Sequence, residues 1–393
     1  MTTYQITMIA PFGMRPKGTL FARMLPLAQA LVRRGHQVRI VAPPLHNPSD
    51  ARTCHTYAGV PVTHTAYTRA TGVQAAILYT VWLLRPLLNH PDQLVYLFKP
   101  KGYGGLAVRL LRALQPHRPV LLDTDDWEGY GGWNDVLPYP TSAKMLFHWQ
   151  ELDLPRHTHA ITAASHTLLE QLHLRGIAPE RSFYVPNGIA VERLHAPLPP
   201  APDPCQPTLL VYTRFWEFQV ADLVQSLVQI MQDRPTVRVL VLGKGEQGQE
   251  QDLLARAQHA GIAAALDYRG WIEPEQIPAL LAQATLALVP VDNTLINQAR
   301  CSAKLLELIA AGVPVVASRV GQMAEYIRVG VNGWLVEPHQ PVAFAQAVLH
   351  LLDQPLHLEH MRLHGRQTLH AYTWDRLAQQ AEAACAYAVA HSG

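Results

Sequence analysis

Short apolar runs rich in β-branched residues alternate with longer stretches of helical periodicity in the first half of the chain. The apolar runs are Ile6 to Ile9, Val38 to Val41, Leu94 to Leu97 and Val120 to Asp123, and the helical stretches include Thr19 to Arg34 and Tyr103 to Leu114. Strands that alternate with helices are typical of a parallel, doubly wound sheet. The first half is therefore predicted to be one α/β domain.

A proline-rich segment, His195 to Pro204, then interrupts the pattern, because proline can donate neither to a helix nor to a central strand. The alternation restarts after it with apolar runs at Leu209 to Tyr212, Val237 to Leu242, Leu286 to Val289 and Val313 to Ser318. We therefore predict an α/β protein with two facing Rossmann-like domains, over residues 1–195 and 208–372, joined by a linker over 196–207.

The last helical pattern, Trp374 to Ala390, has no strand to follow it. It comes after a helix predicted over Pro355 to His370, which completes the second domain. We expect the helix over residues 374–390 to pack back on the first domain.

Composition narrows the class of protein. The 393 residues are 49% hydrophobic and 16% charged, and the net charge of +2 includes no block of like charges, so a nucleic-acid partner is not expected. The cysteines form no CxxC pair, which favours reduced thiols and no zinc site. The N-terminal residues lack the pattern of a signal peptide, and we expect a cytoplasmic protein.

The apolar helical stretch Val73 to Leu88 is too short to span a bilayer and contains Arg85 and Pro86. Two interpretations remain for it. It is either a helix that packs on the core of the first domain, or a helix that makes a peripheral contact with a membrane.

Ligands of open α/β sheets bind beyond the carboxyl ends of the strands, so the residues at those ends are the candidates for a site. Gly243 and Gly245 follow one such strand, where glycine lets the backbone approach a phosphate and a helix N-terminus offers N–H groups. The alternative is an ordinary tight turn between strand and helix.

Lys304 and Glu307 stand three residues apart near the start of a predicted helix, and so share one face of it. A lysine there can neutralise a diphosphate, and a carboxylate one turn later can accept hydrogen bonds from a ribose diol. Together they indicate a nucleotide-sugar site, and the alternative is a surface ion pair.

Two groups of polar residues follow strands of the first domain. Asp125, Asp126 and Glu128 lie among aromatic residues after the strand Val120 to Asp123, a mixture typical of sugar sites, although helix capping by the aspartates is the alternative. The loop that contains Arg15, Lys17 and Gly18 joins the first strand to a helix and offers positive charge and N–H groups to a donor or an acceptor.

The segment Lys304 to Ser318 resembles the donor-binding helix and following strand of the family 4 retaining glycosyltransferases. Further segments follow the order of that family: Val185 to Ile189, Arg214, Gly243 to Gly245, Gly270 to Ile272, Gly321 to Glu325 and Asn332 to Val336.

The resemblance implies a GT-B fold, a nucleotide-diphosphate sugar bound by the second domain, an acceptor hydroxyl bound by the first, and retention at the anomeric carbon. It implies neither a metal nor a resident cofactor, since the nucleotide sugar is a co-substrate. Arg214 and Lys304 would stabilise the diphosphate, with Gly18 beside it. Family members often have a histidine at the strand end where this chain has acidic residues, so Asp126 is a catalytic candidate by its own position and not by the resemblance, and no general base is assigned. The remaining donor contacts would come from Gly243, Gly245, Trp271, Ile272, Leu305, Leu306 and Glu307.

Two positions depart from the family pattern. Ala299 stands where the first of two paired glutamates is expected, and Gln219 stands where a lysine usually follows Arg214. Asp292 or Asn297 from the preceding loop is a candidate to replace the missing glutamate near the sugar. The departures keep two other functions open: a partner protein that binds nucleotide sugars without catalysis, and a sugar-nucleotide epimerase of the same fold.

Overall fold

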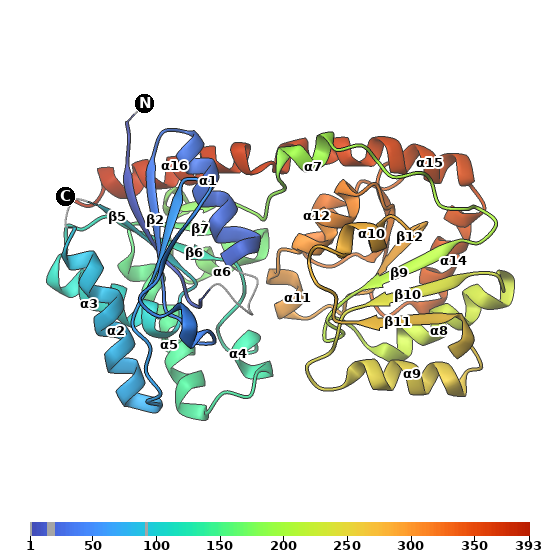
Figure 1. The fold of residues 1–393 in the computed structure, drawn as a ribbon, viewed down its shortest axis with the longest axis horizontal. Coiled ribbons are helices and arrows are strands. Elements are labelled where there is room, and N and C mark those ends of the chain that lie inside the picture. Colours follow the sequence, from blue (N-terminus) through green and yellow to red (C-terminus); the bar gives the residue numbers. More distant parts are fainter. Residues whose placement is uncertain (1, 14–19, 91–92) are drawn as a thin grey trace. The chain divides into compact units, whose positions relative to one another are not determined.

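The computed structural model describes residues 2–13, 20–90 and 93–393, and the chain forms two compact units. Unit 1 contains Met1–Gly188, Ala299–Cys301 and Tyr372–Gly393, and unit 2 contains Ile189–Gln298 and Ser302–Ala371. Each unit has one largely parallel sheet with helices on both of its faces (Figure 1). The predicted α/β class with two doubly wound sheets is confirmed.

The sheet of unit 1 has the strand order β3-β4-β2-β1-β5-β6-β7-β8, and only the pairing of β3 with β4 is antiparallel. Its inner strands are apolar over nearly their whole length because helices cover both faces. The strands are β1 (Gln5–Ile9), β2 (Gln37–Ala42), β3 (Cys54–Tyr57), β4 (Val60–His64), β5 (Leu94–Phe98), β6 (Val120–Thr124), β7 (Ala160–Ala163) and β8 (Ser182–Tyr184).

The helices of unit 1 form two layers. In one layer α2 packs on α3 and α3 on α5, and in the other α1 packs on α16, which also contacts β6, β7 and β8 (Figure 1). The helical elements are η1 (Leu20–Met24), α1 (Leu25–Arg33), η2 (Pro48–Asp50), α2 (Gly72–Leu88), α3 (Gly102–Leu114), α4 (Trp133–Val136), α5 (Thr141–His157), α6 (His166–Leu174), η3 (Pro179–Arg181) and α16 (Trp374–Ala390).

The sheet of unit 2 is fully parallel, with the order β11-β10-β9-β12-β13-β14. The order reverses between β9 and β12, which is the switch point where ligands bind in such sheets. The strands are β9 (Thr208–Tyr212), β10 (Arg238–Leu242), β11 (Leu266–Gly270), β12 (Leu286–Val289), β13 (Val315–Ser318) and β14 (Gly333–Val336).

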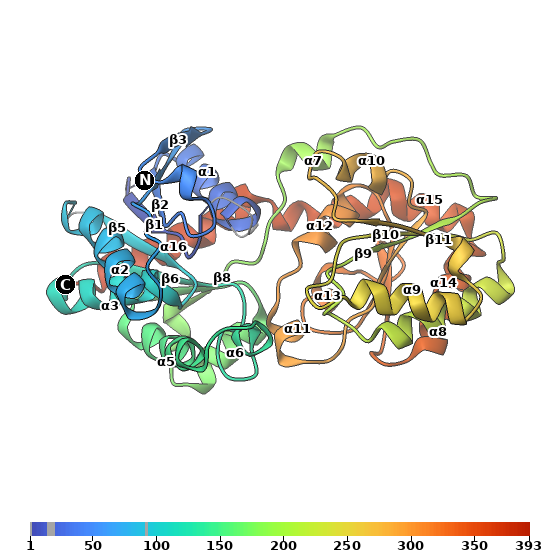
Figure 2. The ribbon, with the colours of Figure 1, turned by 60° about the horizontal axis from the view of Figure 1, so that its bottom comes forward.

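Within unit 2, α8 packs against both α9 and α14, and α12 packs against α13 (Figure 2). The buried side chains of α8 and α14 join those of the strands in one apolar core. The helical elements are α7 (Val191–His195), α8 (Val220–Asp233), α9 (Gln249–His259), η4 (Ala263–Ala265), α10 (Ile277–Leu281), α11 (Leu295–Ala299), α12 (Ala303–Ala310), α13 (Met323–Tyr326), α14 (Pro341–Leu352), α15 (Pro355–His364) and η5 (Gly365–Tyr372).

The chain divides earlier than the proline-rich segment suggests. Unit 2 starts at Ile189 rather than near residue 208, because residues 196–207 pack on that unit. The carbonyl of Pro199 accepts a hydrogen bond from Nη1 of Arg362 at 2.9 Å, and the carbonyl of Ala196 accepts one from Arg366 at 2.6 Å. A proline-rich sequence predicts irregular backbone, but not which body that backbone packs on.

The C-terminal helix belongs to unit 1, and α16 has the predicted bounds Trp374–Ala390. Its Trp374, Leu377 and Ala381 are buried in the core of unit 1. Trp374 also packs against Gly188. A Cβ atom on residue 188 would lie 2.8 Å from the Trp374 ring, so only glycine fits at this position.

Some local boundaries differ from the sequence predictions. The helix predicted over Pro355 to His370 ends at His364 and continues as the 3₁₀ segment η5. The short strands β3, β4, β7, β8, β11 and β14 were not predicted, and each of them contains a polar residue, a proline or a glycine that interrupts its apolar run. In the part of the chain that the structure describes, no helix has both the length and the apolar character needed to cross a membrane.

Candidate functional site

The turn that follows β9 holds Arg214 at the surface of unit 2. Buried Glu217 accepts hydrogen bonds from the Thr213 hydroxyl at 2.9 Å and from the Arg214 N–H at 3.2 Å, and the Thr213 hydroxyl accepts one from the Phe215 N–H at 2.8 Å. Phe215 has a left-handed φ of 69° and is buried. The backbone around Arg214 is thus fixed, while its guanidinium is exposed.

Lys304 and Glu307 lie beside the end of β9. The Lys304 ammonium lies 4.5 Å from the centre of the Tyr212 ring, a cation–π distance. Glu307 forms an ion pair of 3.2 Å with Arg193 of α7. Burial raises the pKa of Tyr212 and the Glu307 carboxylate raises it further, while Arg214 and Arg193 oppose this. Three cations and one carboxylate therefore surround Tyr212, and we call these five residues the β9 cluster.

The start of α12 adds backbone donors to this cluster. Ser302 caps the helix by accepting a hydrogen bond from the Leu305 N–H at 3.3 Å, and α12 begins one residue later at Ala303. The first N–H groups of a helix have no partner within it and favour anions. The side chains of Leu305 and Leu306 are fully buried, so these two predicted donor contacts are restricted to the backbone.

The predicted phosphate cradle at Gly243 and Gly245 uses most of its donors internally. The Gly243 N–H donates to the carbonyl of Gly270 at 2.7 Å, and the Gly245 N–H donates to the carboxylate of Glu250 at 2.9 Å. Gly243 has a φ of 121°, and a Cβ atom there would lie 1.8 Å from the carbonyl oxygen of Thr213. The close packing explains the glycine at position 243, in agreement with the alternative of a tight turn between strand and helix. The nearby Glu250 carboxylate disfavours an anion at Gly245.

Trp271 and Ile272 follow β11, two strands away from β9 in the sheet. Gly270 turns the chain with a φ of 66°, and Trp271 is 67% exposed, whereas Ile272 is half-buried. An exposed indole at a strand end offers a flat surface for stacking.

The segment before α12, which includes α11, forms hydrogen bonds within itself and with the turn that follows β9. Asn297 is buried, and its amide donates to the carbonyls of Glu217 at 2.8 Å and Asp292 at 3.0 Å. Asp292 accepts a hydrogen bond from the Gln219 N–H at 3.3 Å and lines a cavity of about 20 Å³ with His339. Such a cavity has room for about one water, not for a sugar. Ala299 is fully buried.

In unit 1 the predicted acceptor carboxylates form a buried ionic cluster around Lys99. Its ammonium lies 2.8 Å from Asp125, 2.5 Å from Asp126 and 3.4 Å from Glu128, and Lys101 lies 2.9 Å from Glu128. Lys99 has a left-handed φ of 66°, and such strain in a residue other than glycine is often found at functional sites. Neither lysine was singled out from the sequence, because each carboxylate partner is more than twenty residues away.

Charges in this Lys99 cluster are shielded from water to different degrees. The Glu128 side chain is fully buried, and although burial alone would raise its pKa, Lys101 and Lys99 hold that pKa below the usual value. Burial raises the pKa of Asp126 against the opposing effect of Lys99, and 22% of this side chain remains exposed. Asp126 is thus the carboxylate of the cluster that a ligand can reach most readily.

Three predicted residues, Arg15, Lys17 and Gly18, lie outside the described residues. Within residues 2–13, 20–90 and 93–393, no group of three or more histidine, cysteine, aspartate or glutamate side chains is arranged to hold a metal ion. His357 Nε2 donates to the carbonyl of Gly330 at 2.8 Å, and the rings of His360 and His364 lie 4.6 Å apart, tilted by 41°.

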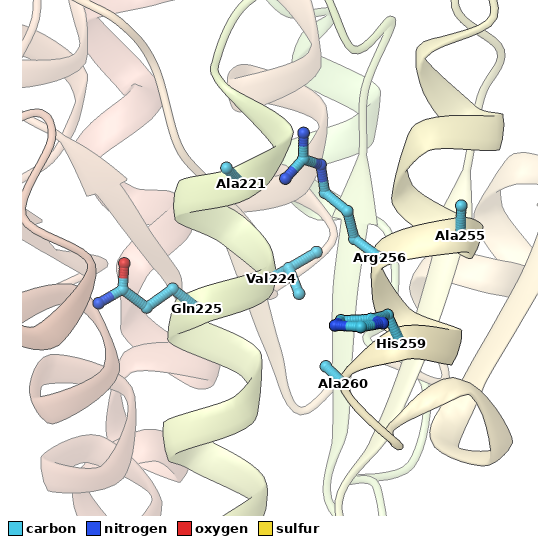
Figure 3. Close-up of a pocket in the computed structure, with 7 residues that line it drawn as sticks. All are labelled: Ala221, Val224, Gln225, Ala255, Arg256, His259 and Ala260. Carbon is cyan, nitrogen blue, oxygen red and sulfur yellow. The ribbon is translucent and has the colours of Figure 1, made fainter.

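Another cavity of unit 2 lies away from the predicted site. Figure 3 shows this groove of about 420 Å³ between α8 and α9, lined by Ala221, Val224, Gln225, Ala255, Arg256, His259 and Ala260. None of the predicted site residues lines it.

Two family models match the chain. The model described as a glycosyl transferase 4-like domain matches residues 20–188, and the model of the glycosyl transferases group 1 matches residues 206–354. Together they cover most of both units.

Curated relatives and solved structures agree with these matches. The chain is 23% identical to a phosphatidyl-myo-inositol mannosyltransferase of Mycobacterium leprae over 96% of this chain and 95% of the relative. It is 29% identical to a D-inositol 3-phosphate glycosyltransferase of Acidothermus cellulolyticus over 48% of this chain and 44% of the relative.

Among solved structures, sucrose-phosphate synthase of Thermosynechococcus elongatus matches with a TM-score of 0.73 at 18% identity, covering 96% of this chain and 97% of that one. HepE of Anabaena in complex with UDP and glucose matches with a TM-score of 0.70 at 16% identity, covering 96% and 98%. The expected GT-B fold is confirmed. The chain belongs to the family 4, group 1 glycosyltransferases and is a transferase.

Proposed function

We propose that this enzyme moves a sugar from a nucleotide-diphosphate sugar to an acceptor hydroxyl, with retention at the anomeric carbon and without a metal ion or a resident cofactor. The observation that carries the proposal is the β9 cluster of unit 2. It places Arg214, Lys304 and Arg193 around one carboxylate at the switch point of a parallel sheet, beside the start of α12.

The charges of this cluster suit a departing diphosphate. Lys304 and Arg214 supply fixed positive charge near the N–H groups of α12, and positive charge aimed at a leaving group stabilises the transition state. This is also why we propose that no metal is required. Glu307 would accept the ribose hydroxyls, and Trp271 would contact the base. The HepE structure contains UDP and glucose, which supports a nucleotide sugar as donor.

We further propose that unit 1 binds the acceptor and that Asp126 is its contact to the reacting hydroxyl. The acceptor class remains broad: a glycan, a lipid-linked sugar or a small molecule. The names of the two relatives refer to phosphatidyl-myo-inositol and to D-inositol 3-phosphate, so these two acceptors are the first to test. We propose the cytoplasm as the location, with a peripheral contact at the inner face of the membrane.

The other function that the sequence left open, a partner protein that binds a nucleotide sugar without transferring it, is disfavoured by the transferase assignment above, and one position speaks for it. Ala299 favours this alternative, because a buried alanine cannot contact a sugar through a carboxylate. Asp292 is a weak replacement, since its carboxylate already accepts from the backbone of Gln219. Turnover of a bound sugar nucleotide would exclude this alternative, and turnover without any acceptor would favour an epimerase instead.

The first experiment is a thermal-shift panel of UDP, GDP, ADP and dTDP with their sugars. At about 100 times Kd a ligand should stabilise the protein by about 2.7 kcal/mol, an increase in Tm of several degrees. We expect one base to stabilise the wild type and Glu307→Ala to lose that response. Asp233→Ala, which removes an exposed carboxylate at the end of α8, serves as the control.

The second step adds acceptors to the nucleotide sugar that stabilises the protein. Product formed with EDTA present, and with the anomeric configuration of the donor retained, would support the complete proposal. Absence of any nucleotide response in the wild type would contradict the donor site. Inversion at the anomeric carbon, or an absolute need for a divalent cation, would contradict the proposed mechanism.

A further inference from the structure

The loop that follows β6 is folded around one buried indole. Trp127 is 3% exposed, its Nε1–H donates to the carbonyl of Tyr130 at 2.9 Å, and its own carbonyl accepts from the Trp133 N–H at 2.9 Å. The guanidinium carbon of Arg175 lies 4.1 Å from the centre of the indole ring. Hydrogen bonds and a cation–π contact therefore fix the Trp127 loop, by which we mean residues 127–133.

Three glycines determine the path of this loop. A Cβ atom on residue 129 would lie 2.3 Å from the Trp127 ring, and one on residue 132 would lie 2.3 Å from the Trp127 carbonyl oxygen. Gly131 has a left-handed φ of 70°, a conformation that favours glycine. Close packing on both sides of residue 130 thus defines the position of the residue at the tip of the loop.

Tyr130 occupies that tip and is 67% exposed. One side of its ring lies against His148 of α5, with 3.8 Å between the ring centres. The His148 side chain is 5% exposed, and its Nε2 lies 3.1 Å from the Asp135 carboxylate, which also accepts a hydrogen bond from the Gly131 N–H at 2.7 Å. The phenol ring therefore rests on a fixed support and presents the rest of its surface to solvent.

The exposed ring lies near the accessible carboxylate of the Lys99 cluster. Asp126, whose side chain is 22% exposed, is four residues from Tyr130, and both follow β6. Four residues span at most about 14 Å, so the two side chains share one area of the surface. Ligands of parallel sheets bind beyond the carboxyl ends of the strands, which is where this area lies.

An aromatic surface beside a carboxylate selects for a particular kind of ligand. The C–H groups on one side of a pyranose or inositol ring form an apolar face, and the hydroxyls project from the edge of the ring. An acyl chain lacks the hydroxyls, and an open-chain polyol lacks the flat face. A six-membered ring polyol is therefore the chemistry that Tyr130 and Asp126 can recognise together.

We propose that Tyr130 is a stacking subsite for the acceptor, and that the acceptor is a six-membered ring polyol, either a pyranoside or an inositol. This inference rests on the proposal that unit 1 binds the acceptor, and it names the class of acceptor for that site. It does not depend on the donor, because the Trp127 loop and His148 belong to unit 1.

The test measures acceptor binding without requiring turnover. Saturation transfer difference NMR is recorded on the full chain, with and without a nucleoside diphosphate. The probes are the methyl glycosides of glucose, galactose and mannose, myo-inositol, and D-glucitol as the open-chain polyol. We expect at least one ring polyol to receive saturation at the C–H protons of one face, and D-glucitol to receive much less. The ring that binds distinguishes a pyranoside from an inositol.

Variants of the loop tip then test the aromatic ring itself. Tyr130→Ala should weaken binding of that ring polyol by about tenfold, because the stacking surface is lost, whereas Tyr130→Phe should bind within about twofold of the wild type. In turnover, Tyr130→Ala should raise the acceptor KM by a similar factor and leave hydrolysis of the nucleotide sugar by water unchanged.

A matched control is Leu114→Ala. Leu114 is 62% exposed at the end of α3, which precedes the amino end of β6, whereas Tyr130 follows the carboxyl end of that strand. This variant should bind the ring polyol as the wild type does.

Three results would overturn the proposal. The wild type could bind none of the ring polyols, Tyr130→Ala could bind them as well as the wild type does, or D-glucitol could bind as well as a ring. Failure of the donor site gives a different pattern: no nucleotide raises the Tm of the wild type, while Tyr130→Ala still loses the signal of the ring polyol.

Discussion

The two charged clusters of this protein differ in the burial and in the charge balance of their ionised side chains. In unit 1 the Lys99 side chain is only 3% exposed and has three carboxylates within 3.4 Å. In unit 2 the β9 cluster holds more positive than negative groups, and Arg214 and Arg193 are exposed. Buried ions that are paired with one another depend on their partners, because the loss of one partner leaves a buried charge uncompensated, whereas an excess of positive charge at the surface is suited to an anionic ligand.

Removal of the central cation should reveal the structural role of the first cluster. Lys99→Met leaves the carboxylates buried without their main partner, and breaking a buried ion pair in this way costs about 3–5 kcal/mol of unfolding free energy. Urea unfolding should show this loss, and Lys144→Met, at a partly exposed lysine of the same unit whose ammonium donates only to the carbonyl of Asp135, should cost much less. A loss below about 1 kcal/mol, as is usual for surface ion pairs, would remove the contrast between the clusters.

Removal of a cation from the β9 cluster should affect catalysis rather than folding. Lys304→Gln should lower the transfer rate by about 10²- to 10³-fold, because a fixed donor of charge to the leaving group is lost. Its unfolding free energy should change by less than about 1 kcal/mol.

Arg238→Gln is the matched control for this variant. Arg238 is an exposed cation at the amino end of β10, whereas the β9 cluster lies at the carboxyl end of the neighbouring strand. Equal rates for Lys304→Gln and Arg238→Gln would show that the charge at Lys304 has no part in the reaction.

The ion pair between Arg193 and Glu307 allows a finer test. Glu307→Gln should weaken nucleotide binding by about 10- to 100-fold, since hydrogen bonds to a charged group contribute about 1.5–3 kcal/mol. Arg193→Ala removes only an exposed pair and should change the affinity by less than about fivefold. Calorimetric titration with the preferred nucleoside diphosphate measures both. The reverse order of effects would assign ligand binding to Arg193 instead.

The smallest expected effect concerns pH and the interior of unit 1. Burial, with added repulsion from Arg112 and Arg181, lowers the pKa of His159 from 6.5 to about 4, and the Val120 N–H donates to its ring at 3.0 Å. The folded state thus keeps this imidazole neutral while the unfolded state binds a proton. Its contribution to stability is complete above pH 6.5 and decreases as the pH falls toward 4.

In that pH range His159→Gln should reduce the slope of the unfolding free energy against pH, by an amount that corresponds to at most one proton taken up on unfolding. His117→Gln, at an exposed site, should leave this slope unchanged. Thermal unfolding at a series of pH values measures this. An unchanged slope in His159→Gln would show that other groups cause any loss of stability in acid.

The sequence alone determined those features of the protein that depend on local pattern. The apolar runs of β1, β5, β9 and β12, the long helices α2 and α16, and the family motifs around Arg214 and Lys304 all follow from contiguous residues. Periodicity and spacing act over one or two turns, so they identify elements and the side chains that share a face.

Only the tertiary structure decided which distant residues meet. It brought Lys99 to Asp126 and Arg193 to Glu307, and it assigned the proline-rich segment to unit 2. Such pairings depend on strand order and helix packing, which a local pattern does not contain. Burial is settled in the same way: the sequence of α2 shows an apolar helix, and only its packing shows that Ile77 faces outward while Tyr79 faces the core.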